Sequence, residues 1–216
     1  MKKNLQCLIG TALFTLILNS PVAAAGYYMG IQGGVGFPQE TKANDSEGSR
    51  NFTYDAGYDA SIILGYDLGE EHPRVGRGRV ELEFNTASND LNEAEFVEGK
   101  VGAGGSADRT SIMLNTIGEY VTQAGMTIYA LIGLGWAEIS LDNVSIMGDP
   151  FVDDSNNQLA YQFGLGLAWN LSKHFVFDVG YRYYGTTDPE FTTKDGTSLD
   201  YEYASHRILA GLRLHF

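Results

Sequence analysis

Apolar and polar residues alternate along much of the chain, and the alternation is clearest at its end. Successive side chains of a β-strand point to opposite faces, so residues of one parity share a face. One face of 203–216 is mainly apolar, and the other is mainly polar and cationic. The first holds Ala204, His206, Ile208, Ala210, Leu212, Leu214 and Phe216, and the second holds Tyr203, Ser205, Arg207, Leu209, Gly211, Arg213 and His215. This segment is predicted to be a strand with lipid against its apolar face.

Similar patterns mark eight strand-like segments. They cover about 26–37, 54–68, 78–89, 109–122, 125–139, 158–171, 174–186 and 202–216. Most of them combine an apolar face with a face of small or polar residues, as a narrow barrel requires. The segment 125–139 is nearly all apolar, so its register is the least defined. We assign its outward face to Ile128, Ile132, Leu134 and Trp136.

The connections between these segments alternate in length. Short turns fall near 69–77, 123–125 and 171–173, whereas polar, acidic loops of about 38–53, 90–108, 140–157 and 187–201 join the other ends. Short turns at one end and long loops at the other are typical of outer-membrane barrels, with the long loops extracellular. The sequence therefore predicts four long acidic extracellular loops.

The predicted fold is all-β, an eight-stranded antiparallel up-and-down transmembrane β-barrel over residues 26–216. No apolar run after residue 26 approaches the roughly 18 residues of a spanning helix. A chain in the membrane must then close its strands into a barrel, because lipid cannot satisfy backbone groups. A soluble lipocalin-like barrel, with its apolar face inward, is the alternative fold.

Aromatic residues stand near both ends of the predicted strands on the outward face, where interfacial girdles form. They are Tyr27, Tyr58, Tyr66, Tyr120, Trp136, Trp169, Phe175, Tyr183 and Phe216. Ordinary β-propensity explains aromatics in strands but not their placement near both ends. The aromatic pattern therefore favours the transmembrane barrel.

Residues 1–25 resemble a secretory signal peptide that precedes this barrel domain. Lys2 and Lys3 come before an apolar run, and Ala23 and Ala25 supply a small-residue cleavage site before Gly26. The only cysteine, Cys7, lies in this segment. After cleavage, no disulfide or thiol chemistry is expected.

The chain is acidic, with 27 Asp and Glu against 14 Lys and Arg and a formal net charge of −13. This balance excludes a typical nucleic-acid binder, which needs clustered Lys and Arg. No histidine pair has metal-ligand spacing, and no glycine cluster has the form of a nucleotide motif. We therefore expect neither a metal site nor a cofactor.

Charged residues gather on the predicted inward faces. We expect a lumen network made of Arg79, Glu81, Glu83, Glu119, Asp178, Arg182, Arg207 and Arg213, with Asp59 as a further acid. One interpretation is a gated ion path, and the other is a closed polar plug in which buried charges are paired. The plug is favoured because eight strands leave room for little more than side chains. Arg182 and Arg207 are expected to bridge Glu81, Glu83 or Glu119.

Three stretches resemble the small eight-stranded outer-membrane proteins of Gram-negative bacteria. This group includes the OmpA transmembrane domain, OmpX and the opacity-type surface proteins. The stretches are RVELEFN at 79–85, LGLAWNLSKHFVFDVGYRYYGT at 165–186 and HRILAGLRLHF at 206–216. The resemblance implies a monomer in the outer membrane, in contact with lipid and lipopolysaccharide.

The last residues also resemble the β-signal read by the barrel-assembly machinery. Gly211, Leu214 and Phe216 match that signal, whereas Leu209 stands where a polar residue is usual. The resemblance implies that this machinery and periplasmic chaperones are partners.

The expected function is structural, adhesive or antigenic and acts through the extracellular loops, for which a host or surface ligand is a candidate partner. A small porin is the alternative, and a lipid-modifying enzyme is a more distant one. Ser205 and His206 are adjacent in a strand, so they point to opposite faces and cannot share a proton.

Overall fold

We analysed a computed structural model that describes residues 26–39, 41–45, 48–69, 77–96, 99–187, 190–193, 196, 198–201 and 203–216. The predicted signal peptide, with Ala23 and Ala25, lies outside these residues. No helix in the described part of the chain is long and apolar enough to cross a membrane. The described strands are β1 (Tyr27–Pro38), β2 (Thr41–Asp45), β3 (Gly48–Tyr54), β4 (Gly57–Asp67), β5 (Gly78–Phe96), β6 (Gly99–Val121), β7 (Met126–Ile146), β8 (Asp149–Asn170), β9 (Phe175–Thr186), β10 (Glu190–Thr192), β11 (Ser198–Tyr201) and β12 (Ala204–His215).

Eight strands close into an antiparallel ring in the order β1, β4, β5, β6, β7, β8, β9, β12 and back to β1. A row of paired residues followed once around the ring starts at Tyr27 and returns to β1 at Phe37, ten residues farther along. The row passes through Tyr66, Val80, Thr116, Ile132, Phe163, Tyr183 and His206. This offset is the shear of a closed barrel, and it requires the strands to tilt against the barrel axis.

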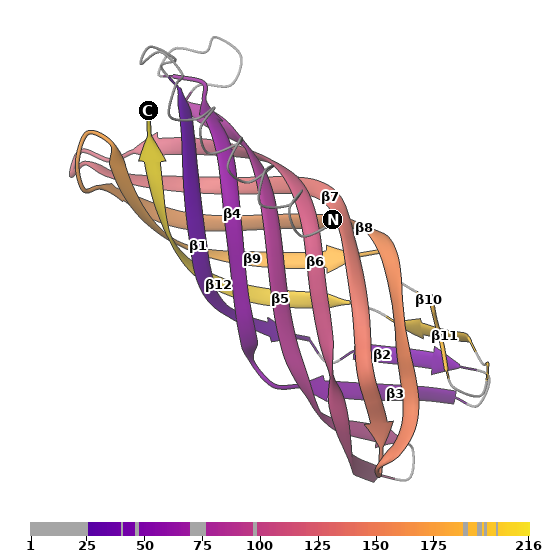
Figure 1. Ribbon diagram of the computed structural model, residues 1–216. Coiled ribbons are helices and arrows are strands. Elements are labelled where there is room, and N and C mark those ends of the chain that lie inside the picture. Colours follow the sequence, from indigo (N-terminus) through magenta and orange to yellow (C-terminus); the bar gives the residue numbers. More distant parts are fainter. Residues whose placement is uncertain are drawn as a thin grey trace, which may run out of the picture.

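Four ring strands are interrupted near one end and continue as shorter strands (Figure 1). β2 extends β1, β3 precedes β4, β10 extends β9 and β11 precedes β12. β2 pairs with β3 and β11, β3 pairs with β5, and a bridge between Val152 and Thr193 links β8 to the segment after β10. We call this part the extracellular tier: β2, β3, β10, β11 and the ends of β5–β8 beside them. The ring below it is the membrane tier.

The prediction of four long loops is therefore wrong within the described residues. The ranges 38–53, 90–108, 140–157 and 187–201 contain β2, β3, β10, β11 and the far ends of β5, β6, β7 and β8. The short connections lie at the other end, where Thr122 and Gly125 close one hairpin and Leu171 bonds to Phe175 in another. The C-terminus lies at this end in Figure 1. By the usual topology of such barrels, this end is periplasmic.

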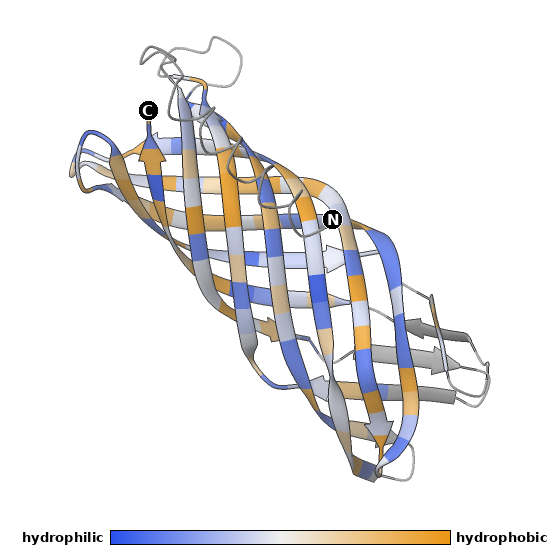
Figure 2. Ribbon diagram, in the orientation of Figure 1, coloured by the Kyte–Doolittle hydropathy of each residue, from blue (hydrophilic) through white to orange (hydrophobic). Residues whose placement is uncertain are grey.

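The membrane tier is apolar outside. Its strands carry exposed aliphatic and aromatic side chains on one face, and apolar and polar residues alternate along them in Figure 2. In the segment with the least defined register, Ile128, Ile132, Leu134 and Trp136 point outward as predicted, and Tyr129 points inward. The lipocalin-like alternative required the opposite arrangement.

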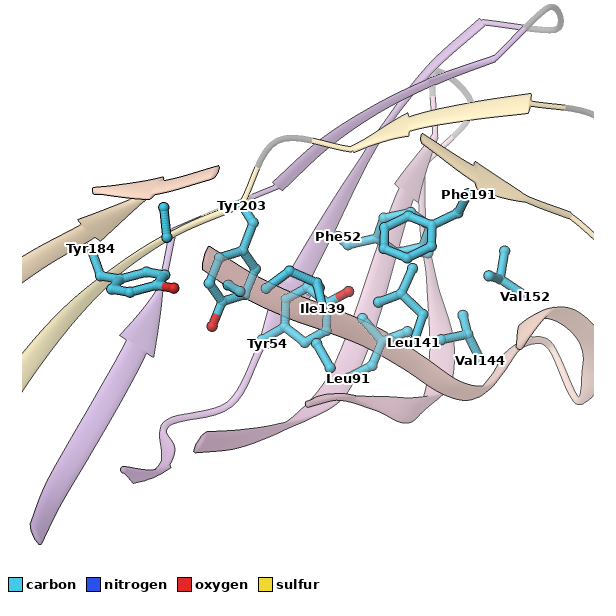
Figure 3. Close-up of a cluster of buried hydrophobic side chains, with 14 of the residues drawn as sticks. Phe52, Tyr54, Leu91, Ile139, Leu141, Val144, Val152, Tyr184, Phe191 and Tyr203 are labelled. Carbon is cyan, nitrogen blue, oxygen red and sulfur yellow. The ribbon is translucent and has the colours of Figure 1, made fainter. Parts of the chain in front are cut away.

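The extracellular tier reverses this arrangement. Its interior is an apolar cluster that includes Phe52, Leu91, Ile139, Leu141 and Phe191 (Figure 3). Its outward face carries exposed acids at Asp90, Glu138 and Asp153. The two faces of the long strands thus exchange their chemistry, and register shifts between Asp90 and Glu93, Gly104 and Ser106, and Leu141 and Val144 interrupt the period of two in this tier. The exchange marks the level at which lipid gives way to water outside the barrel.

Two inward tyrosines lie flat against glycines on the neighbouring strand. Tyr28 is paired with Gly65, and Tyr129 is paired with Gly166. A side-chain carbon at either glycine would overlap the tyrosine ring. These inward glycines make room for rings that reach across the narrow interior, where Tyr28 donates to Glu81 and Tyr129 to Asp178.

Replacing Gly166 with alanine should force the Tyr129 ring to move. We expect Gly166→Ala to lower the free energy of unfolding by about 1–3 kcal/mol, the usual effect of overpacking. Gly118→Ala is the matched control, because a carbon there meets no atom within 4 Å. Urea titration of the barrel in phosphatidylcholine vesicles, followed by tryptophan fluorescence, measures both. Equal midpoints for the two variants would contradict this packing.

Candidate functional site: the polar interior of the barrel

The interior of the membrane tier is lined by charged and amide side chains. The structure places all eight residues of the predicted network there, with exposures of only 0% for Glu83 and Arg207 and 1% for Asp178. Glu119 is also nearly covered and forms ion pairs with Arg77 and Arg79. Buried charges of this kind must be paired and hydrogen-bonded to be tolerated.

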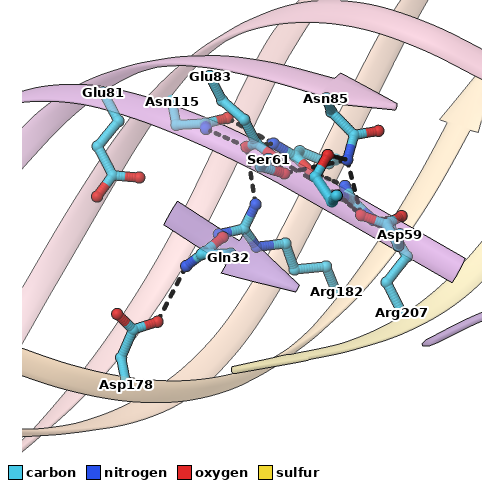
Figure 4. A network of polar contacts seen from close by, with 12 residues as sticks. Gln32, Asp59, Ser61, Glu81, Glu83, Asn85, Asn115, Asp178, Arg182 and Arg207 are labelled. Carbon is cyan, nitrogen blue, oxygen red and sulfur yellow. Dashed lines mark hydrogen bonds and ion pairs between the residues drawn. The ribbon is translucent and has the colours of Figure 1, made fainter. Parts of the chain in front are cut away.

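Glu83 is the centre of the network (Figure 4). One of its carboxylate oxygens, Oε2, accepts from Arg182 Nη1 at 2.7 Å. The same oxygen accepts from the amides of Asn115 at 2.8 Å and Gln162 at 2.9 Å. The other oxygen accepts from Ser61 at 2.8 Å and from Arg207 Nη2 at 3.4 Å. Its donors come from five different strands, so this one carboxylate ties opposite walls of the barrel together.

Asp59 forms a second centre, nearer to the extracellular tier. Arg207 binds it in a bidentate manner, with Nε to Oδ2 and Nη2 to Oδ1, both at 2.7 Å. Arg109 Nη2 also donates to Oδ2 at 2.7 Å, and Asn85 donates to Oδ1 at 2.7 Å. Paired, planar contacts of this type are the strongest class of charge-assisted hydrogen bond.

Arg109 was missing from the predicted network, although it is among the largest fully buried side chains. It donates to Asn85, Tyr203 and Ser205 as well as to Asp59. Its guanidinium carbon lies 4.0 Å from the centre of the Tyr184 ring, so an aromatic side chain covers the network toward the extracellular tier. Arg109 has the same parity as Ser111 and Asn115, and this signal could have revealed it.

Further ion pairs fill the periplasmic half of the interior. Arg79 pairs with Glu119 and with Glu81, the latter at 2.8 Å, and Arg213 Nε lies 3.4 Å from Asp178 Oδ2. Gln32 joins the two halves, because it accepts from Arg182 at 2.7 Å and donates to Asp178 at 3.0 Å. A connected set of polar contacts thus runs through much of the membrane tier.

The charges of these clusters balance. Their buried acids are Asp59, Glu81, Glu83, Glu119 and Asp178, and their buried bases are Arg79, Arg109, Arg182, Arg207 and Arg213. Arg77, whose side chain is 33% exposed, is a further base that pairs with Glu119. Among the described residues, the buried carboxylates and the buried guanidinium groups of these clusters are therefore equal in number. The predicted bridges from Arg182 and Arg207 meet at Glu83, whereas Glu81 and Glu119 pair with Arg79.

Other predicted residues lie away from this network or outside the description. Ser205 points inward to Arg109, whereas His206 points outward between Tyr181 and Gln39, so the two do not form a catalytic pair. In the assembly-signal motif, Gly211 is buried beside Gln32 and Phe216 is 51% exposed. Gly26 begins the described chain. The part of the chain that is described holds no group of three or more metal-ligating side chains.

The fold and this interior define an outer-membrane β-barrel. The chain belongs to the family of the outer membrane protein beta-barrel domain, whose model matches residues 10–216. Its place is therefore the outer membrane of Gram-negative bacteria.

Solved structures show the same fold at low sequence identity. Neisserial surface protein A is 18% identical with a TM-score of 0.54, over 89% of this chain and 98% of that one. OprG from Pseudomonas aeruginosa is 15% identical with a TM-score of 0.57, over 89% and 97%. The outer membrane protease OmpT from Escherichia coli is 11% identical with a TM-score of 0.51, over 90% and 98%. No curated protein matches the chain.

Removing one charge from the centre of the network should destabilise the barrel. Glu83→Gln leaves Arg182 and Arg207 without their shared counter-charge, and we expect a loss of about 3–5 kcal/mol in the free energy of unfolding. Glu93→Gln is the control, because its ion pair with Lys100 is exposed on both sides. Urea unfolding in lipid vesicles compares them. A wild-type midpoint for Glu83→Gln would show that the network is not stabilising.

Proposed function

We propose that the protein is a closed, non-enzymatic surface protein of the outer membrane, with a structural, adhesive or antigenic role. The observation that carries this proposal is the charge-balanced network in the membrane tier, whose acids and arginines are almost wholly buried. An ion or solute that passed through the barrel would have to displace these side chains from one another.

The energetics of the network support a closed state. Opening a path near Asp59 requires the separation of Arg207 and Arg109 from one carboxylate that they share. Breaking one buried ion pair costs about 3–5 kcal/mol when its partner stays buried and uncompensated. A barrel built in this way favours the paired arrangement over any open one.

The extracellular tier supports a role at the cell surface. Its apolar interior, which includes Leu141, Val144 and Val152, holds the outer strands together above the membrane. Backbone that is paired in a sheet presents the same side chains to each partner, whereas a long irregular loop does not. The outward acids Asp90, Glu138 and Asp153 give this surface its polar character.

A non-enzymatic role is supported by the separation of the nucleophile and base types. Ser205 lies inside the barrel and His206 outside it. The likeness to OmpT is one of fold at 11% identity and carries no protease activity to this chain.

Single-channel recording in planar lipid bilayers tests the closed barrel. The wild-type protein should show no large, steady conductance. The double variant Asp59→Ala/Arg207→Ala removes a buried pair without changing the net charge, and it should show frequent openings. Glu93→Ala/Lys100→Ala removes an exposed pair and should behave as the wild type does. Steady conductance of the wild-type barrel would overturn the proposal and favour the small porin.

A further inference from the structure

An open groove of about 500 Å³ lies on the lipid-facing surface of β1, β4, β5 and β6. Three small outward side chains, Ala60, Thr86 and Thr110, line it as neighbours in one row of paired residues. Larger side chains from the next row, Ile31 and Phe84 among them, stand along the periplasmic side. Ile31 is 63% exposed, so it projects beyond the neighbouring small residues.

The groove coincides with a gap in the outer aromatic girdle. Tyr58 on β4 and Trp136 on β7 are 58% and 62% exposed near the extracellular edge of the apolar band. The two strands between them, β5 and β6, carry Thr86 and Thr110 close to this level. Because the paired rows climb around a tilted barrel, the groove rises from β4 to β6 toward the outer interface. Its interior therefore faces hydrocarbon and its upper end faces head groups.

The upper end of the groove has a polar rim. Two residues beyond Thr86 and Thr110 on the same faces are Ser88 and Asp108, which pair with each other. Asp108 also pairs with Ser140, whose hydroxyl donates to Asp142 at 2.9 Å. Asp108 is half-buried and interacts with Ser88 and Asp142 on the same rim. The rim thus places the carboxyl groups of Asp108 and Asp142 beside the upper end of the groove.

We propose that this groove binds one acyl chain of an outer-leaflet lipid, whose head group donates an amine or hydroxyl hydrogen bond to Asp108. The small side chains let a hydrocarbon chain approach the sheet closely, and close packing is what distinguishes one site from bulk lipid inside a membrane. The acceptor-rich rim favours a donor head group over a purely anionic one.

A second copy of the chain fits this surface less well. Face-to-face contact would bring Asp108, Asp142 and the nearby Glu138 of two molecules together, and like charges oppose such contact. The projecting Ile31 and Phe84 side chains would also hold another barrel away from the groove. A single flexible acyl chain meets neither obstacle.

The proposed lipid site does not depend on whether the lumen of the barrel conducts ions.

Native mass spectrometry of the refolded barrel in a non-ionic detergent tests the groove. The protein is titrated with phosphatidylethanolamine or phosphatidylcholine that carry identical saturated chains, because the choline head group has no hydrogen-bond donor. We expect one tight site, with about fivefold preference for the ethanolamine lipid, in line with one added charge-assisted hydrogen bond. Thr86→Phe fills the groove and should weaken both lipids about tenfold through lost contacts. Thr116→Phe makes the same change on the lipid-facing side of β6 outside the groove and should leave binding unchanged.

The variant Asp108→Asn distinguishes the contribution of the polar rim to lipid binding from that of the apolar groove. This variant should bind both lipids at the single site but lose the preference for ethanolamine, whereas Asp153→Asn, an exposed acid on β8, should keep it. Unchanged binding by folded Thr86→Phe, checked by its heat-modifiable migration, would overturn the groove as the site. Equal affinity of the wild type for the two lipids, or an unchanged preference in Asp108→Asn, would overturn the role of the rim.

Discussion

Closure of eight strands with an offset of ten residues is the constraint on which this structure depends. Closure satisfies every strand edge without water, which is the condition for a sheet in lipid. It also fixes an interior so narrow that side chains must fill it. Flat pairs such as Tyr129 on Gly166, and the ion pairs around Glu83, are two ways in which this sequence fills that space. The closure of the barrel wall therefore determines which side chains can occupy the lumen.

The alternation of residues was sufficient to predict the membrane tier. Parity alone placed Ile208 outside and Arg182 inside, because lipid and a polar lumen impose opposite chemistry on the two faces. The extracellular tier escaped prediction for the same reason. On the extracellular side of Thr110 in β6, water lies outside the barrel and an apolar cluster lies inside it. The rule that apolar residues face outward therefore fails in this part of the strand. A register shift between Leu141 and Val144 also breaks the period of two, so this segment of β7 has the sequence pattern of an irregular loop.

The interior network was predictable in composition but not in its pairings. Glu83 and Arg207 could be assigned to the lumen from their parity, but their partners depend on the shear, which no single strand reveals. Arg109 is the first residue of the predicted segment 109–122, whereas in the structure β6 begins at Gly99 and Arg109 lies well inside the strand. The amides of Asn115 and Gln162 complete the set of hydrogen-bond donors to Glu83. Because these side chains are uncharged, the sequence alone does not identify them as partners of a buried carboxylate. Their contribution is visible only when the strands are assembled.

The central claim is that buried ion pairs hold the lumen closed, and a double-mutant cycle on Asp59 and Arg207 tests it most directly. The free energies of unfolding of Asp59→Ala, Arg207→Ala and the double variant are measured in the same lipid vesicles. The account predicts strong coupling, with an interaction energy of about 1–3 kcal/mol, because each single variant leaves a buried charge without its partner. Additive effects, with an interaction energy near zero, would contradict it.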